Sequence, residues 1–159
     1  TYKGVVLRDL QQTLEYLSKN GRVDQSRIGV AGASLGGELS VALAITREDI
    51  KAIAFSSYAE QGRFSDFQRA LKKQPHYCHL VPGLGEFMRR EDTFRLLAPR
   101  PTLGLREFKS KTAYENFEDK IGKAWEFSPG ESRFEFRLIE DGNHEFFVDQ
   151  TIQFFEKNL

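Results

Sequence analysis

One short stretch decides the fold of this chain, and it reads R-I-G-V-A-G-A-S-L-G-G over Arg27–Gly37. The apolar residues within Arg27–Ala31 predict a buried strand, and the run after the serine predicts a helix. Between them lies G-A-S-L-G, in which Gly32 and Gly36 flank Ser34. Because a Cβ at either glycine would crowd the turn or the helix packed on it, the motif fits a tight, strained turn. This order is that of a nucleophile elbow, which raises a serine hydroxyl above the end of a strand.

Helical and strand patterns alternate along the rest of the chain. Apolar spacing predicts a helix before the turn and three more strands after it. The expected elements are a helix over 4–19, a strand over 27–31, a helix over 35–46, a strand over 50–55, helical turns near 65–72 and 91–97, a strand over 101–105, a helix over 111–125, a strand over 133–139 and a helix over 146–155. Strands separated by such connections form a parallel sheet with right-handed crossovers. The sequence therefore predicts one α/β domain over 1–159, with an irregular insertion at about 59–100.

The composition predicts a globular domain with neither a nucleic-acid nor a membrane partner. The 159 residues include 23 Lys plus Arg and 23 Asp plus Glu, so the formal net charge is zero. A neutral balance provides no basic footprint for nucleic acid or an anionic membrane. No apolar run approaches the roughly 20 residues that a spanning helix needs. The chain starts at Thr1 without a signal-peptide pattern, and this position need not be the biological N-terminus.

A serine hydroxyl becomes a nucleophile only when a base takes its proton. His144 is the candidate base for Ser34, because it lies in D-G-N-H just after the predicted strand over 133–139. The carboxyl ends of parallel strands meet at one edge of a sheet, so we expect both residues at that edge. The N–H of Leu35, at the start of the next helix, would face the developing oxyanion. The alternatives are a serine in an ordinary glycine-rich turn and a histidine that caps the last helix.

The acid of such a triad should follow the strand over 101–105, where it would hold the histidine tautomer. No aspartate occurs between Asp92 and Asp119, and Glu107 is the only carboxylate at the end of that strand. Glu107 is therefore the candidate acid, and the alternative is a solvated charge. Glu140 and Asp141, which lie near the histidine in sequence, are expected to be capping or solvated groups.

The sequence gives little support for a metal or a cofactor. His76, Cys78 and His79 lie close together in the irregular segment, but no second pair of ligands matches them. The predicted site therefore contains no metal and no cofactor. As the only cysteine, Cys78 excludes an internal disulfide and leaves the cellular compartment open.

The chain resembles the dienelactone hydrolase and acetyl xylan esterase-like branch of the α/β hydrolases. The resemblance rests on D-L-Q-Q-T-L-E-Y-L, V-D-Q-S-R-I-G-V-A-G-A-S-L-G-G, C-H-L-V-P-G-L, D-T-F-R-L-L-A-P-R-P and D-G-N-H-E-F. It covers nearly the whole chain, but only as the C-terminal part of such an enzyme. It implies a mostly parallel sheet flanked by helices, with Ser34 as nucleophile and His144 as base. It also implies that a small-molecule ester is the substrate, such as an acetylated sugar.

The chain departs from this branch in two places. The strand after A-P-R-P continues in the family into a G-x-x-D turn that carries the acid, and this turn is missing here. We also expect the first strands of the family to be missing, with the loop that supplies the second oxyanion donor. The elbow strand would then expose an edge, and an exposed apolar edge needs a covering. A second copy of the chain and a preceding segment both stay open as that covering.

Two functions therefore remain open at this stage. The first is a serine hydrolase that acts on small carboxylic esters through an acyl-enzyme. The second is a catalytically impaired or non-enzymatic hydrolase fragment that serves binding or assembly. The intact elbow and D-G-N-H favour the first, and the missing G-x-x-D turn favours the second.

Overall fold

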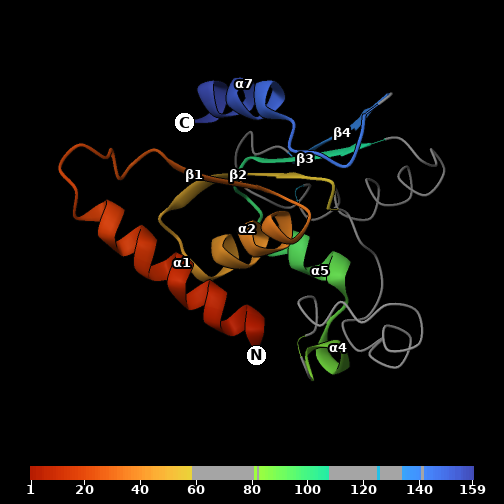
Figure 1. The fold of residues 1–159 in the computed structure, drawn as a ribbon, viewed down its shortest axis with the longest axis horizontal. Helices are drawn as coiled ribbons and strands as arrows, with labels where there is room; N and C mark the ends of the chain where they lie inside the picture. The colour runs from red at the N-terminus through yellow and green to blue at the C-terminus, as the bar shows by residue number, and fades with distance from the viewer. Residues whose placement is uncertain (59–80, 82, 108–124, 126–133, 141) are drawn as a thin grey trace.

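Four parallel strands lie side by side in the order of the chain, β1-β2-β3-β4, and helices cover both faces of this sheet (Figure 1). The computed structural model describes residues 1–58, 81, 83–107, 125, 134–140 and 142–159. The elements are α1 (Tyr2–Ser18), β1 (Ile28–Ala33), α2 (Leu35–Thr46), β2 (Ile50–Ser56), α4 (Leu84–Phe87), α5 (Arg90–Arg95), β3 (Thr102–Glu107), β4 (Phe134–Ile139) and α7 (Val148–Asn158). The predicted α/β class with a parallel sheet is confirmed.

Most elements agree with the sequence prediction, and the differences are one additional short helix and shifted element ends. The short helix α4 was not expected, and β3 continues two residues beyond its predicted end, to Glu107. The predicted helical turn near 65–72 and the metal candidates His76, Cys78 and His79 lie outside the described residues. The predicted helix over 111–125 also lies outside them, apart from its last residue, which is helical. The longer β3 matters because it places a carboxylate inside the sheet.

The two faces of the sheet build two separate cores. Ile53 and Phe55 of β2 point toward α2, where they pack with Val41. Ala54, between them in sequence, points to the opposite face and packs with Phe154 of α7. This alternation follows from the two-residue period of a strand. In Figure 1, α1, α2 and α5 lie on one side of the sheet and α7 on the other.

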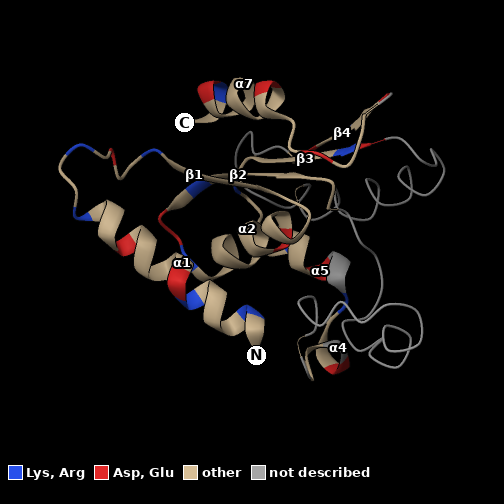
Figure 2. Ribbon diagram, in the orientation of Figure 1, with Lys and Arg blue, Asp and Glu red and all other residues tan. Residues whose placement is uncertain are grey.

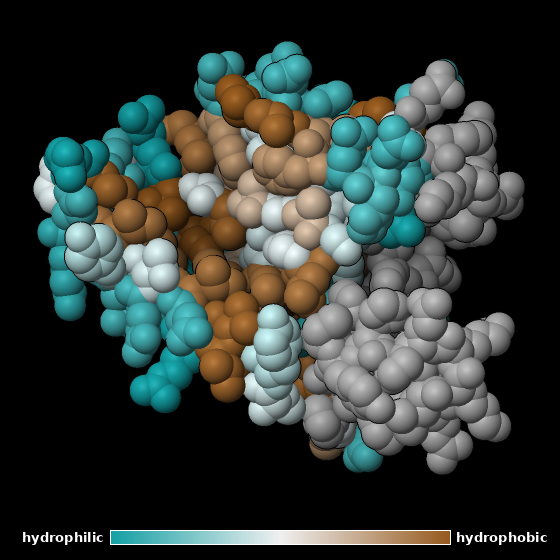
Figure 3. Space-filling view, in the orientation of Figure 1, coloured by the Kyte–Doolittle hydropathy of each residue, from teal (hydrophilic) through white to brown (hydrophobic). Residues whose placement is uncertain are grey.

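The strand before the elbow is less buried than the sequence predicted. All six residues of β1 are partly exposed, whereas every residue of β2 except Lys51 is buried. The reason is the position of β1 at the outer end of the strand order, where it pairs only with β2 among the described residues. The space-filling view shows apolar surface across the middle of the molecule, where β1 and α2 lie in the same orientation in Figure 1 (Figure 3).

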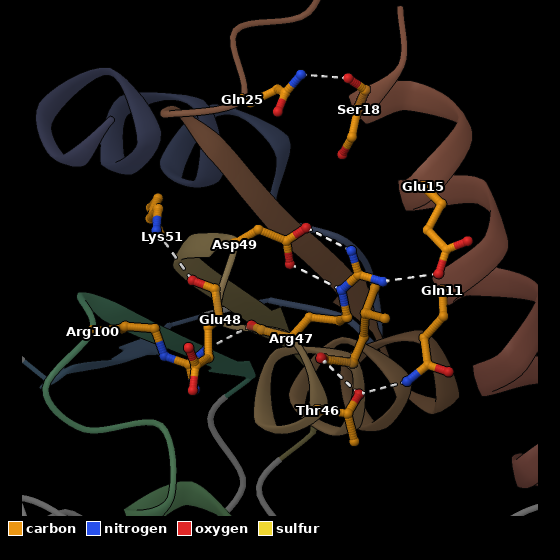
Figure 4. Close-up of polar contacts among 11 residues, drawn as sticks. Gln11, Glu15, Ser18, Gln25, Thr46, Arg47, Glu48, Asp49, Lys51 and Arg100 are labelled. Carbon is orange, nitrogen blue, oxygen red and sulfur yellow. Dashed lines mark hydrogen bonds and ion pairs between the residues drawn. The ribbon is translucent and has the colours of Figure 1, made fainter.

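Ion pairs and hydrogen bonds join several elements at the C-terminal end of α2 (Figure 4). Arg47 binds Asp49 through two contacts, with Nη2–Oδ2 at 2.7 Å and Nε–Oδ1 at 3.0 Å, and reaches Glu15 of α1 at 3.4 Å. The hydrogen bond from Arg47, the largest influence, holds the pKa of Asp49 below its usual range. Arg100, which precedes β3, donates from Nη1 to the carbonyl oxygen of Ala44 at 2.6 Å. These contacts join α1, α2 and the segment before β3 at the edge opposite the elbow.

Charged residues are otherwise spread over the surface of the molecule. Figure 2 shows Lys and Arg interspersed with Asp and Glu along α1 and α7. A buried ion pair joins α1 to α2, in which Lys3 of α1 binds Glu38 in the first turn of α2. Among the described residues, none of the helices combines the length and apolarity that crossing a membrane requires.

The turn between β1 and α2 depends on the absence of a side chain at Gly32. A Cβ placed there would lie 2.3 Å from the Gly36 carbonyl oxygen and 2.8 Å from Ser40 Oγ. A Cβ at Gly36 would meet nothing within 4 Å. The expectation that both glycines are needed for packing is therefore wrong for Gly36. The close approach involves the backbone of Gly36, which any residue supplies.

We expect the two glycines to respond differently to the same substitution. Gly32→Ala forces the strand and helix apart and lowers the free energy of unfolding by about 1–3 kcal/mol, as overpacking does. Gly36→Ala is the matched control, and it leaves this free energy unchanged or raises it by up to about 1 kcal/mol through helix propensity. Urea unfolding followed by circular dichroism measures both. Equal stability of the two variants would contradict the packing argument.

Candidate active site

Ser34 occupies a strained turn directly after β1. Its φ of 53° and ψ of −119° lie in a region that non-glycine residues rarely adopt and that costs about 1–3 kcal/mol. Its N–H donates to the Ser56 carbonyl oxygen at 2.9 Å, and its carbonyl accepts from the Glu38 N–H at 3.1 Å. The residue is therefore held by β2 on one side and by the first turn of α2 on the other. Ser34 as a whole is partly exposed.

Glu107 lies inside the sheet and contacts the candidate base. It is the last residue of β3 and pairs with Ile139 of β4. Its side chain is only 2% exposed, and Oε1 lies 3.4 Å from His144 Nδ1. The alternative of a solvated charge is wrong, because β3 continues through Glu107 and keeps the carboxylate between neighbouring elements. A buried carboxylate thus lies at the end of β3, where the acid was expected, and its role as the acid stays a prediction.

His144 lies on the loop between β4 and α7, and 57% of its side chain is exposed. The residue at the N-cap of α7 is Phe147, and it makes no side-chain capping bond. The alternative that His144 caps this helix is therefore wrong. The Phe147 N–H donates to Ser56 Oγ at 3.4 Å, which ties the end of the loop to β2. Glu140 is exposed, as expected for a solvated group, and Asp141 lies outside the described residues.

Ser57 is a site residue that the sequence reasoning did not identify. It follows β2, has a φ of 51° and is 5% exposed. Its Oγ donates to Glu107 Oε2 at 2.9 Å and lies 3.2 Å from the Glu145 carbonyl oxygen. The only sequence signal was the polar run Ser56-Ser57-Tyr58 after an apolar strand. That run shows a strand end, but it does not show which carboxylate the second serine meets.

The carboxylate of Glu107 is kept ionised by the groups around it. Burial is the largest single influence and would by itself raise the pKa of Glu107. Hydrogen bonds from its own backbone N–H, from Ser57 and from His144, with the charge of Arg106, act in the opposite direction. Together they outweigh the burial, so the pKa of Glu107 lies below its usual value of 4.5. A buried acid that stays ionised suits a partner that becomes cationic.

Leu35 begins α2 directly after the serine. The N–H groups of the first helical turn have no acceptors within the helix, and the helix dipole favours a negative charge there. Leu35 is partly exposed, so a ligand can reach this end of the helix. The predicted oxyanion role of its N–H is therefore compatible with its place in the fold. Within the described ranges, no group of three or more His, Cys, Asp or Glu could hold a metal ion.

The predicted residues all follow the carboxyl ends of strands, at one edge of the sheet. Ser34 follows β1, Glu107 ends β3, and His144 lies on the loop after β4. The structure brings Glu107 and His144 into contact, and the Ser56 carbonyl oxygen links the elbow to β2, the neighbour of β3. Their roles in a reaction stay predictions, for which this edge supplies the geometry.

Known proteins share both the sequence pattern and the fold. Residues 1–96 match the acetyl xylan esterase (AXE1) family. A glucuronoyl esterase from Solibacter usitatus aligns with a TM-score of 0.67 at 14% identity, over 96% of this chain and 47% of that chain. A glucuronoyl esterase from Teredinibacter turnerae gives 0.67 at 18%, over 95% and 45%. A protein assigned as an acetyl xylan esterase from Bacteroides fragilis gives 0.69 at 21%, over 99% and 49%.

These structures share the fold of the chain, which spans about half their length. At such identities the likeness shows the fold alone, and the sequence match shows the family. That match runs from α1 through the elbow to α5 and covers more than half of the chain. The resemblance to acetyl xylan esterase-like α/β hydrolases is thereby confirmed. With its parallel sheet and its serine elbow, this chain belongs to the acetyl xylan esterase family.

Proposed function

We propose that this chain carries the catalytic residues of a serine esterase that hydrolyses small carboxylic esters. The observation that carries the proposal is the contact between the buried carboxylate of Glu107 and His144 Nδ1, at the edge where the Ser34 turn lies. Serine, acid and histidine occur in the chain order of α/β hydrolases. Membership of the acetyl xylan esterase family favours an acetyl group on a sugar as the substrate class.

The reaction would proceed through an acyl-enzyme. Ser34 Oγ attacks the acyl carbonyl while His144 Nε2 takes the hydroxyl proton, and a tetrahedral intermediate forms. Its collapse breaks the ester bond, and the proton on Nε2 passes to the leaving alcohol. Water then attacks the acyl-enzyme, with His144 as the base again. The acid product and free Ser34 result.

Glu107 would act on His144 and not on the substrate. An ionised carboxylate beside Nδ1 fixes the proton on that nitrogen and leaves Nε2 free to accept. It also stabilises the imidazolium that forms during attack. The lowered pKa of Glu107 keeps it ionised for this role at neutral pH.

The oxyanion would bind at the start of α2. The Leu35 N–H follows the nucleophile directly and belongs to a turn whose donors have no helical acceptors. One such donor contributes about 10²–10³ in rate. A second oxyanion donor would come from a residue other than Leu35.

A role in binding or assembly is the second candidate. The observation that favours it is the outer position of β1, whose six residues are all partly exposed and which pairs only with β2 among the described residues. The missing G-x-x-D turn also favours it, whereas the contact between Glu107 and His144 favours the esterase. The assay below separates the two functions.

We expect the protein to hydrolyse p-nitrophenyl acetate and Ser34→Ala to lower kcat/KM by about 10³-fold or more, because a triad fails without its nucleophile. Absorbance of released nitrophenol measures this rate. A fluorophosphonate should label the wild type at Ser34 and not the variant.

Ser40→Ala is the matched control for this assay. Ser40 is a buried serine of α2 whose hydroxyl donates to the Gly36 carbonyl oxygen, and its loss should leave the rate within about twofold. Equal rates in the wild type and Ser34→Ala would overturn the esterase proposal and leave the binding role.

The state of Glu107 should make stability depend on pH. Because its pKa in the folded chain lies below the usual 4.5, its ionised form stabilises the fold above pH 4.5, and this contribution is lost as the pH falls through the folded value. The melting temperature of the wild type should therefore fall more steeply toward acid pH than that of Glu107→Gln, because glutamine does not ionise there. Parallel curves for the two proteins between neutral pH and pH 3 would show that Glu107 is not held ionised by the fold.

A further inference from the structure

Ser57 lies between the two halves of the candidate site. It continues β2, since its N–H donates to the Leu105 carbonyl oxygen of β3 at 2.8 Å. The residue before it accepts from the Ser34 N–H. Ser57 thus lies at the same sheet edge as the elbow, one strand from Ser34 and one strand from Glu107.

The hydroxyl of Ser57 faces two acceptors and has one proton to donate. Glu107 Oε2 lies 2.9 Å away, and the Glu145 carbonyl oxygen lies 3.2 Å away. The carboxylate is the closer acceptor and carries a charge, so the Ser57 hydroxyl donates its hydrogen bond to Glu107. This bond occupies Oε2 and leaves Oε1 for His144 Nδ1.

The end of β2 also holds the loop that carries the histidine. Ser56 Oγ accepts from the Phe147 N–H, and Ser57 Oγ lies beside the carbonyl oxygen of Glu145, the neighbour of His144. Both serines are buried, so water does not compete freely for these groups. Ser57 therefore touches the acid and lies against the loop of the base.

The backbone of Ser57 is a second observation that points to a function for this residue. A φ of 51° is unfavourable for a serine, and glycine would adopt it without strain. The fold holds a side chain in a place where a residue without one fits more easily. Strain of this kind collects at functional sites.

We propose that Ser57 is a positioning residue of the esterase, which fixes the Glu107 carboxylate so that Oε1 faces His144 Nδ1. The inference rests on the proposed function, because its consequence for catalysis requires the triad. Ser57 touches neither the substrate nor the reacting atoms in this scheme, and it acts through Glu107.

Two substitutions separate the hydroxyl from the backbone. Ser57→Ala removes the hydroxyl and keeps the strained Cβ, whereas Ser57→Gly removes both. Each should lower kcat for p-nitrophenyl acetate by about 10- to 100-fold with KM nearly unchanged, as loss of alignment does. In a Glu107→Gln background, Ser57→Ala should have much less effect, because the partner that it orients is already changed. Ser40→Ala again serves as the control for loss of a buried serine hydroxyl.

A carboxyl titration by carbon-13 NMR tests the contact without relying on turnover. The pKa of Glu107 should rise in Ser57→Ala relative to the wild type, because a hydrogen bond to the ionised form is lost. The Ser40→Ala control should leave that pKa unchanged. Since Ser57→Gly also relieves the strained backbone, it provides a folded variant if Ser57→Ala unfolds.

The outcomes distinguish this inference from the proposed function. If the wild type hydrolyses the ester through Ser34 and both Ser57 variants keep its kcat, the positioning role is overturned and the esterase stands. If only Ser57→Gly keeps the wild-type kcat, the importance of Ser57 lies in its backbone, and the positioning role is again overturned. If the wild type shows no hydrolysis that depends on Ser34, the esterase fails and the catalytic use of Ser57 fails with it. An unchanged Glu107 pKa in Ser57→Ala would show that the hydroxyl does not hold the carboxylate.

Discussion

The close packing of Gly32 against the backbone of Gly36 is the constraint on which the rest of this structure depends. It lets β1 run directly into α2 with no loop between them, so the chain must reverse at Ser34 itself. The serine takes a strained conformation as a result, and the carbonyl of Ser56 in the neighbouring strand holds it there. The strain is stable because strand, helix and neighbour all fix it together. The side chain of Ser34 is thus presented by a turn that β1, α2 and β2 hold together.

The sequence predicted well those features that depend on neighbours in the chain. The elbow and the parallel α/β sheet follow from local apolar patterns and from G-A-S-L-G-G, and the structure agrees with them. It predicted less well what depends on distant partners. Glu107 follows an arginine at the polar end of a strand, so its burial can be recognised only once β4, Ser57 and the histidine loop are in place. The exposure of β1 also depends on its position in the sheet, and the expected loss of the first strands of the family had indicated it.

The end of β2 contacts several parts of the site, which its sequence alone does not indicate. Its core residues divide between the two faces of the sheet, and its last residues are serines with buried polar contacts. Through a carbonyl and two hydroxyls, this strand end contacts the elbow, Glu107 and the loop before α7. Each bond is short-range and modest, yet the groups are shielded from water, where hydrogen bonds determine orientation most strongly. The geometry of the site is therefore a property of the sheet edge as a whole.

The simple strand order has a consequence for how such a domain can diverge. Ser34 and Glu107 lie at or just after the carboxyl ends of their strands, and His144 lies on the loop between β4 and α7. A connection can therefore lengthen, shorten or change composition in descendants of this chain while the strand ends keep their register. Selection can remodel what surrounds the serine without dismantling the arrangement at the sheet edge. Parallel sheets with one strand following its neighbour are for this reason well suited to acquiring new substrates from an old chemistry.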